Sequence, residues 1–259
     1  MEHDIIIKTY NSGQKNVALV NNEKYGICIR KTRSAKTSTM RMEREVNIQN
    51  TFDCSYYPKI YYSDVTSNNI LIYEEYIDGK DLWDIFTKEN IYRNNEESCL
   101  KLLKQLLIAL NYIWKKSIIH RDLKHNNIKM RSNGTPVILD LGIAKILDST
   151  DNLTTRMWFT EGYAPIEQFT NQIKLIDKRT DFFSLGVIIY ELFFGFRLFQ
   201  TNDEVIRRMP DFDIKGYTIS DNFKKILSKL LEKRIYNRYR RVEDILEDVN
   251  DALGGKVYE

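Results

Sequence analysis

The stretch from His120 to Asn127, which reads His-Arg-Asp-Leu-Lys-His-Asn-Asn, constrains this chain more than any other part of its sequence. Asp140-Leu141-Gly142 follows thirteen residues after it. The side chains of Asp122, Asn127 and Asp140 end in the carboxylate or amide oxygens that hard Mg²⁺ ions and phosphate chemistry require. Apolar segments flank each of the three and can fix its position, so we interpret them as parts of one site.

The overall composition indicates an ordinary globular protein, with 42% hydrophobic and 29% charged residues in 259. A chain of this length can bury about three quarters of its unfolded surface, enough for one large domain or two lobes. Apolar runs end long before the roughly eighteen residues of a transmembrane helix, and the acidic N-terminus lacks a signal-peptide pattern. We therefore expect a cytoplasmic protein without a membrane partner. The net charge of +3 is too small to indicate a nucleic-acid partner.

The first part of the chain has the pattern of short strands. A charged segment of helical character, from Thr39 to Asn50, interrupts them once. Val17 to Val20 and Tyr25 to Ile29, joined by a polar turn, predict a hairpin, and Ile70 to Tyr73 predicts a later strand. A small lobe of antiparallel strands with one helix follows for residues 1–77.

The second part, residues 78–259, has a helical pattern. Apolar residues recur at three- and four-residue intervals between Leu100 and Ile113, as one buried face of a helix requires. Val137 to Leu139 predicts a short strand that leads into Asp140, and Phe182 to Phe194 predicts a central buried helix. Two further helices are predicted, Asn222 to Lys233 and Val242 to Leu253. The fold class is therefore α+β, with a mainly α second lobe.

The pattern His-Arg-Asp-x-Lys-x-x-Asn resembles the catalytic loop of the eukaryotic-type (Hanks-type) Ser/Thr protein kinases, and Asp140-Leu141-Gly142 is similar to their Asp-Phe-Gly motif. The resemblance covers essentially the whole chain and implies a bare kinase domain with a bilobal fold. Residues 1–77 would bind the nucleotide, and residues 78–259 would carry catalysis and bind the substrate. The implied cofactors are ATP and Mg²⁺, and the implied partners are proteins with Ser or Thr acceptors. Ile166 between Pro165 and Glu167, as in some bacterial members, favours a bacterial origin.

The resemblance gives each residue of the loop a role. Asp122 would be the base for the substrate hydroxyl, and Asn127 and Asp140 would hold magnesium. Lys124 stands where Ser/Thr kinases place the lysine that reaches the transferring phosphate, which favours Ser or Thr as the acceptor. His125 replaces the family's common proline, and we expect it to be a surface substitution and not a second base.

The nucleotide-binding end matches the family less well. Ser12 to Val17 resembles the phosphate-covering loop, but Gly13 is the one family glycine it keeps. Val17 stands where the family packs an apolar residue on adenine. A backbone that approaches phosphate closely prefers glycine, so this loop predicts weaker ATP binding or a stiffer loop.

Two cations compete for the position of the family lysine that holds the α- and β-phosphates. If Asn21 to Lys24 form the hairpin connection, Val17 faces Cys28, and alternation places Arg30 on the cleft side. A three-residue connection would instead direct Lys31 inward.

We expect Arg30, because Ile27 to Arg30 then resembles the family's Val-Ala-Ile-Lys with arginine in place of lysine. A planar guanidinium is not interchangeable with an ammonium at a tight phosphate site. Glu45 is the expected helix partner of whichever cation it is, with Glu43 as the alternative.

The segment from Ile72 to Leu82 resembles the hinge between kinase lobes. Glu75 and Ile77 would offer backbone groups to adenine, and Asp81 would bond the ribose hydroxyls. Glu74 falls at a position where an apolar residue is commoner in the family.

The stretch from Thr160 to Glu167 resembles the end of an activation segment. The resemblance implies that Thr160 touches Asp122 and Lys124, and that Glu167 pairs with Arg238.

Two more supports follow from the resemblance. Asp181 would brace the backbone of the catalytic loop. Arg121 would pair with a phosphorylated activation segment, and we expect autophosphorylation at Thr154 or Thr155.

Two alternatives remain open. The weak glycine loop and an arginine in place of the lysine are also compatible with a pseudokinase, a nucleotide-binding scaffold without useful turnover. A small-molecule phosphotransferase also tolerates arginine on the third strand, but the Thr160 to Glu167 stretch and Arg238 match the peptide-binding lobe of protein kinases.

Overall fold

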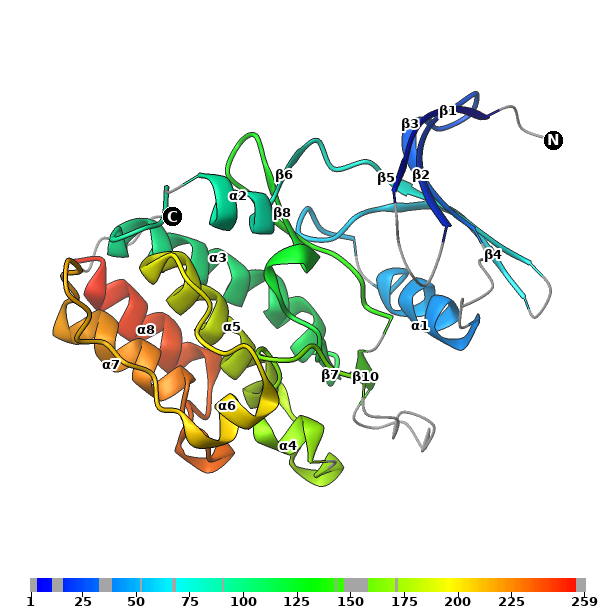
Figure 1. Cartoon of the computed structure of the whole chain (residues 1–259). Helices are drawn as coiled ribbons and strands as arrows, with labels where there is room; N and C mark the ends of the chain where they lie inside the picture. Colours follow the sequence, from blue (N-terminus) through cyan, green and yellow to red (C-terminus); the bar gives the residue numbers. More distant parts are fainter. Residues whose placement is uncertain are drawn as a thin grey trace.

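The computed structural model describes residues 4–10, 16–32, 39–51, 53–66, 69–89, 91–142, 144–146, 158–170 and 172–254. Within these ranges the chain forms a smaller lobe built on a five-stranded sheet and a larger, mainly helical lobe (Figure 1). The α+β fold with two lobes, expected from the sequence, is confirmed. None of the helices in the described ranges combines the length and the apolar character that crossing a membrane requires.

The sheet of the small lobe is antiparallel, with the strand order β1-β2-β3-β5-β4. Its elements are β1 (Asp4–Tyr10), β2 (Asn16–Asn22), β3 (Gly26–Thr32), α1 (Thr39–Gln49), β4 (Ile60–Val65) and β5 (Ile70–Glu75). Met42 and Val46 of α1 pack against Ile70 and Ile72 of β5. The helix therefore covers one face of the sheet, the face that also carries the side chain of Lys31.

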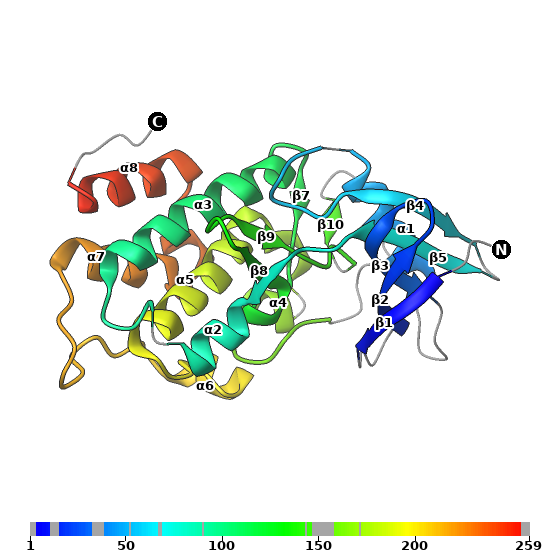
Figure 2. The same ribbon diagram turned by 90° about the horizontal axis from the view of Figure 1, so that it is seen from above.

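The large lobe contains the remaining elements in chain order. They are β6 (Gly79–Asp81), α2 (Leu82–Lys88), α3 (Glu96–Trp114), β7 (Ile118–Ile119), η1 (His125–Asn127), β8 (Ile128–Arg131), β9 (Pro136–Ile138), β10 (Lys145–Ile146), α4 (Ile166–Phe169), η3 (Ile173–Leu175), α5 (Lys178–Phe194), α6 (Asn202–Arg207), α7 (Asp221–Leu230), η4 (Ile235–Asn237) and α8 (Val242–Ala252). β6, β8 and β9 form a small sheet, and β10 pairs with β7 (Figure 2). These short strands carry the loops on which the site is built.

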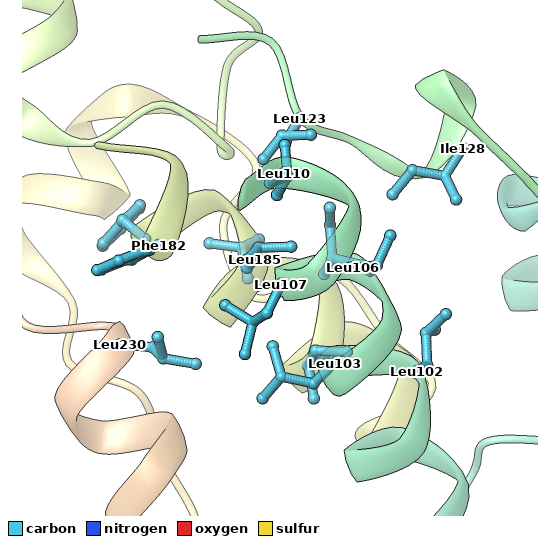
Figure 3. Packing of buried hydrophobic residues seen from close by; sticks show 14 of the residues in the cluster. Leu102, Leu103, Leu106, Leu107, Leu110, Leu123, Ile128, Phe182, Leu185 and Leu230 are labelled. Atoms are coloured by element: carbon cyan, nitrogen blue, oxygen red, sulfur yellow. The ribbon is translucent and has the colours of Figure 1, made fainter. Parts of the chain in front are cut away.

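The core of the large lobe forms around α3 and α5. Leucines of α3 meet Phe182 and Leu185 of α5, while Leu123 and Ile128 approach from the catalytic-loop side (Figure 3). Every residue of α5 from Thr180 to Phe194 is buried, as the sequence pattern predicts. The helix begins at a cap, where the Asp177 side chain accepts a hydrogen bond from the Arg179 backbone N–H. It ends at Gly195, whose φ of 72° is the left-handed conformation that glycine adopts readily.

Within the described residues, two of the attachments between the lobes bear on how the site is assembled. The chain passes from one lobe to the other between β5 and β6, at residues 76–78. Separately, Ile48 of α1 and Tyr57 of the segment after it belong to the core cluster of the large lobe. The Tyr57 hydroxyl donates a hydrogen bond to the Ala109 carbonyl of α3 at 3.2 Å. The small lobe is thus anchored on α3 as well as through the chain itself.

Candidate active site

The backbone of the catalytic loop, residues 120–127, binds a carboxylate of α5. Asp181 accepts hydrogen bonds from the backbone N–H groups of His120 and Arg121, both at 2.9 Å. It also accepts one from the Trp114 indole at 2.8 Å. Burial raises the pKa of Asp181, and these donors act against that rise. Asp181 therefore braces the loop backbone, as the resemblance implies.

The Asp122 carboxylate is the centre of a hydrogen-bonded group. Its Oδ1 accepts from the Thr160 hydroxyl at 2.6 Å, and its Oδ2 accepts from the Lys124 ammonium at 2.9 Å. Lys124 also donates to the Thr160 hydroxyl at 2.9 Å. The Asp122 side chain is 15% exposed, so a substrate group can reach it. The structure thus brings together the three side chains that the resemblance places in contact.

Asn127 contacts this group, and Asp140 lines the same pocket as Asn127. The Asn127 amide nitrogen donates to Asp122 Oδ2 at 3.0 Å and to the Asp122 carbonyl at 2.8 Å, so the amide oxygen is the group that can face a cation. Asp140 has a φ of 59°, and its Oδ1 accepts from the Gly142 N–H at 3.1 Å. A left-handed conformation costs a non-glycine residue about 1 kcal/mol or more, and such strain is typical of functional sites.

A pocket of about 300 Å³ lies between the lobes. Its lining comprises Tyr10, Val17, Ile29, Lys31, Gln49, Pro58, Glu74, Glu75, Tyr76, Ile77, Asp81, Asn126, Asn127, Lys129, Leu139 and Asp140. Most of the residues predicted to bind nucleotide or metal are therefore in one place. Gly13 lies outside the described residues, as do Thr154 and Thr155.

The donor set of this pocket fits a hard cation that phosphates help to hold. Asn127 and Asp140 supply an amide and a carboxylate oxygen, which Mg²⁺ prefers. Among the described residues, no group of three or more His, Cys, Asp and Glu side chains could hold a metal ion. Mg²⁺ commonly binds through one or two protein oxygens together with phosphates and water, so a pair of ligands is the number expected for such a site.

The register of the β2–β3 hairpin decides which cation reaches the pocket. Val17 lies opposite Lys31, while Cys28 lies opposite Val20. The expected pairing of Val17 with Cys28 is wrong, because the connection between Asn22 and Gly26 has three residues and not four. Every side chain of β3 is consequently shifted to the other face of the sheet relative to the expectation.

Arg30 accordingly points away from the cleft. Its guanidinium forms an ion pair with Asp4 of β1 at 2.7 Å. Asp4 also accepts hydrogen bonds from Asn22 and Tyr73, at 2.7 and 2.8 Å. The expected placement of Arg30 beside the phosphates is wrong, since Asp4 holds it on the opposite face.

Lys31 occupies the cleft position in its place. Its ammonium donates to Glu45 of α1 at 2.5 Å and to Glu74 of β5 at 2.7 Å, and all three side chains are buried. Burial acts to lower the pKa of Lys31, but the two carboxylates outweigh burial and raise it. Glu45, and not Glu43, is therefore the helix partner of the cation, whereas the contact with Glu74 was missed.

The hinge residues line the pocket with part of their backbone already bonded. The Glu75 N–H donates to the Lys59 carbonyl at 2.8 Å, and the Ile77 carbonyl accepts from the Lys129 ammonium at 3.3 Å. Asp81 lies 3.8 Å from the same ammonium, and burial raises the pKa of its carboxyl.

His125 does not lie at the surface, so the expectation of a surface substitution is wrong. Its side chain is fully buried and stacks on Phe86 of α2, with ring centroids 4.7 Å apart. Its Nδ1 lies 2.8 Å from the Tyr163 hydroxyl. Burial, reinforced by the nearby charge of Arg197, lowers the pKa of His125 to about 3, so the ring is neutral.

Tyr163 links His125 to a side chain of α5. The Tyr163 hydroxyl donates to Glu191 at 3.2 Å, and the His125 tautomer with a proton on Nδ1 is the one that complements this direction. Glu191 also accepts from Arg197 at 2.8 Å, while burial raises the pKa of Glu191 to about 7. Reasoning from sequence missed this network. The available signal was Glu191 itself, because a carboxyl inside an apolar helix needs polar partners.

The end of the activation segment is fixed by a buried ion pair. Glu167 and Arg238 make two parallel contacts, at 2.7 and 3.1 Å, and both side chains are buried. The next residue, Gln168, donates to the carbonyls of Arg121 and Trp158, at 2.7 and 3.2 Å. The first contact is the pair that the resemblance implies, and the second ties the segment to the catalytic loop.

A two-lobed α+β fold is combined here with an interlobe pocket lined by Lys31, Asn127 and Asp140, next to a hydrogen-bonded aspartate on a buried loop. This combination defines the protein-kinase-like class of folds. Residues 12–249 match the protein kinase domain family, and the chain belongs to that family.

Named relatives agree with this assignment. The chain is 31% identical over 202 residues to "Putative serine/threonine-protein kinase YPL150W" of Saccharomyces cerevisiae, over 73% of this chain and 21% of the relative. It is 33% identical over 159 residues to "Serine/threonine-protein kinase ppk34" of Schizosaccharomyces pombe, over 59% of this chain and 44% of the relative. The matches thus span less than half of each relative's length. Both relatives are eukaryotic, and the bacterial origin expected from the sequence stays a prediction.

Proposed function

We propose that this chain transfers the γ-phosphoryl group of ATP to Ser and Thr hydroxyls of proteins. The observation that supports this most directly is the Asp122 carboxylate, which accepts a hydrogen bond from the Thr160 hydroxyl at 2.6 Å. A carboxylate that binds one aliphatic hydroxyl in this way is suited to orient another, that of a substrate. The names of both relatives, which call them serine/threonine-protein kinases, support the same acceptor class.

In this proposal the chain's own residues align the attacking hydroxyl and neutralise phosphate charge, since phosphoryl transfer needs little covalent chemistry from the protein. Asp122 accepts or orients the proton of the attacking hydroxyl, and Lys124 offsets charge on the transferring group. Lys31, oriented by Glu45, binds the α- and β-phosphates. Asn127 and Asp140 would hold Mg²⁺, which neutralises phosphate charge when bound.

The remaining pocket residues would select the nucleotide. Val17 would pack on adenine, and the Glu75 and Ile77 backbones would bond the adenine edge. Asp81 would bond the ribose hydroxyls, and Gly13 would allow the backbone to approach the phosphates. One pocket is lined by Val17, Glu75, Ile77 and Asp81, which supports this assignment.

Regulation by autophosphorylation at Thr154 or Thr155 is part of the proposal. Arg121 would hold the added phosphate. Its side chain is buried, and its Nε has no hydrogen-bond partner among the described residues, which supports a site for an incoming anion.

The test is transfer of label from γ-labelled ATP with Mg²⁺ to a generic protein acceptor. We expect Asp122→Asn to lower the rate by about 10²–10⁴-fold, the usual contribution of a positioned acid or base. Lys31→Ala should reduce transfer strongly, whereas Arg30→Ala, which removes a neighbouring cation on the opposite face, should stay within a few-fold of wild type. Label that persists in Asp122→Asn would defeat the catalytic assignment.

Three other outcomes separate the alternatives. ATP binding without transfer by the wild type would favour the pseudokinase scaffold. Label on an aminoglycoside but not on protein would favour a small-molecule phosphotransferase. Intact-mass measurement of the same reaction tests autophosphorylation, and an active enzyme without phosphate on the segment that contains Thr154 and Thr155 would contradict it.

A further inference from the structure

Glu74 departs from the family at the inner end of the pocket. It lies on β5, opposite Ile29 of the neighbouring strand β3, and its side chain is buried. Both Glu74 and Lys31 line the pocket, and the Glu74 carboxylate accepts from the Lys31 ammonium at 2.7 Å. An acid thus contacts the cation at a position where the family commonly has an apolar residue.

The contact changes the charge at this end of the pocket. Lys31 already donates to Glu45 at 2.5 Å, so one ammonium faces two carboxylates. Two of its three N–H donors are used by these acids. Counted as formal charges of ionised side chains, Lys31 and Glu45 sum to zero, and Glu74 brings the sum of the three to −1. The large lobe adds the acid Asp140 and the cation Lys129 to the lining of the same pocket.

An anionic ligand at Lys31 meets this excess charge directly. At an effective dielectric constant of about 20, a unit negative charge about 6 Å from a carboxylate is disfavoured by a factor on the order of a hundred. Solvent and counter-ions reduce this, so an effect of about tenfold on affinity is the reasonable expectation. A neutral ligand in the same pocket would not feel the excess charge.

We propose that Glu74 sets the nucleotide affinity of this chain by competing with nucleotide phosphates for the Lys31 ammonium. The inference rests on the proposed function, because it takes the interlobe pocket as the nucleotide site. Glu74 discriminates between ligands by charge: it disfavours phosphorylated nucleotides and leaves neutral nucleosides unaffected. It acts through Lys31, so it determines affinity and takes no part in the transfer step.

The test is calorimetric titration of the whole chain with ADP in the presence of MgCl₂ and, separately, with adenosine. Glu74→Gln keeps the size and the hydrogen-bonding ability of the side chain but removes its charge. Glu97→Gln is the matched control, because it removes one carboxylate from the exposed side of α3, where Glu97 pairs with Lys101. We expect Glu74→Gln to lower the Kd for ADP about tenfold and to leave the Kd for adenosine within about twofold. Glu97→Gln should change neither.

Two results would overturn the inference: unchanged or weaker ADP binding in folded Glu74→Gln, or an equal gain for adenosine, which would indicate a change of pocket shape. Thermal unfolding checks that the variants fold, and Glu74→Met repeats the measurement with an apolar side chain. Both should fold, because the Lys31–Glu45 pair remains and removal of one of two like charges relieves repulsion. ADP binding without phosphoryl transfer would contradict the proposed function alone, whereas no binding of ADP or adenosine by any of these proteins would overturn both.

Discussion

His125 shows how one replaced residue alters the surroundings of a catalytic loop. A proline at this position would offer no polar side-chain group, whereas the imidazole links the loop to Tyr163 of the activation segment and, through it, to Glu191 of α5. The folded protein favours the neutral form of both ends of this network, because burial lowers the pKa of His125 to about 3 and raises that of Glu191 to about 7.

We expect this burial to make stability depend on pH. The pKa of His125 is lower in the folded than in the unfolded chain, so its contribution is present above pH 6.5 and is lost as the pH falls towards about 3. The contribution of His125 to the free energy of unfolding should then fall by about 1.4 kcal/mol per pH unit well below pH 6.5, or roughly 2 kcal/mol between pH 6.5 and 4.5. The measurement is urea unfolding of wild type and of His125→Gln, which cannot titrate.

The difference between the two proteins isolates the imidazole from other titrating groups. Glu191 acts in the opposite direction, since a raised pKa gives a contribution that is present below pH 4.5 and is lost as the pH rises through about 7. Parallel stability curves for wild type and His125→Gln would contradict the prediction.

For single residues, the sequence predicted which residues form the site better than it predicted the direction in which their side chains point. Asp122, Lys124 and Asn127 are fixed relative to one another by a short loop, so the resemblance of that loop to the kinase catalytic loop was enough to predict that they meet. Lys31 and Arg30 differ only in the face they present, and one residue in the hairpin connection reverses that face. Turn length is set by local backbone conformation, which a single sequence specifies weakly.

Among the elements, the end of the activation segment depends on α4 and on the residues before α8. Glu167 lies on α4, and Arg238 follows η4, so their ion pair joins segments that are 71 residues apart. Arg238 also donates to the carbonyl of Arg179 in α5 at 2.9 Å. The Arg238 guanidinium therefore connects the segment after η4 with α4 and with α5.

We expect Arg238→Ala to destabilise the protein by about 3–5 kcal/mol, because it leaves the buried Glu167 carboxylate unpaired. Arg241→Ala is the matched control: its pair with Asp244 is solvent-exposed and should contribute at most about 1 kcal/mol. Urea denaturation measures both. Equal costs for the two variants would show that burial of the Glu167–Arg238 pair does not matter.

The elements themselves were the most predictable part of the fold. The periodic leucines of α3 and the apolar run of α5 predicted two buried helices, because burial leaves a pattern along the chain. The contacts between elements were harder to predict from the sequence. Nothing in the spacing of Glu74 and Lys31 indicates that β3 and β5 are neighbours, and that pairing is what brings the two side chains together.

On the scale of the whole molecule, Tyr57 joins the two lobes. Its ring lies in the large-lobe core, and its hydroxyl bonds to the Ala109 carbonyl. We expect Tyr57→Ala to cost about 3–5 kcal/mol of stability, as for other large aromatic truncations, and Tyr57→Phe about 1 kcal/mol, for the lost hydrogen bond. Unfolding in urea, followed by tryptophan fluorescence, tests both.

The control for this prediction is Tyr62→Ala on β4, where the side chain is 42% exposed and the change should stay within about 0.5 kcal/mol. A cost for Tyr57→Ala that is no larger than the cost for Tyr62→Ala would mean that the segment after α1 does not anchor the small lobe.

The anchoring of the small lobe also has a mechanical consequence. A body held near residues 76–78 and at Tyr57 turns most easily about the line between these two attachments, because a turn about another line would stretch one of them. The Lys31 cluster belongs wholly to the small lobe, and the Asp122, Asn127 and Asp140 group belongs wholly to the large one. Such a turn preserves the contacts inside each group and changes the span between them. Rotation of one lobe relative to the other therefore sets the distance from the Lys31 ammonium to the oxygens of Asp122, Asn127 and Asp140.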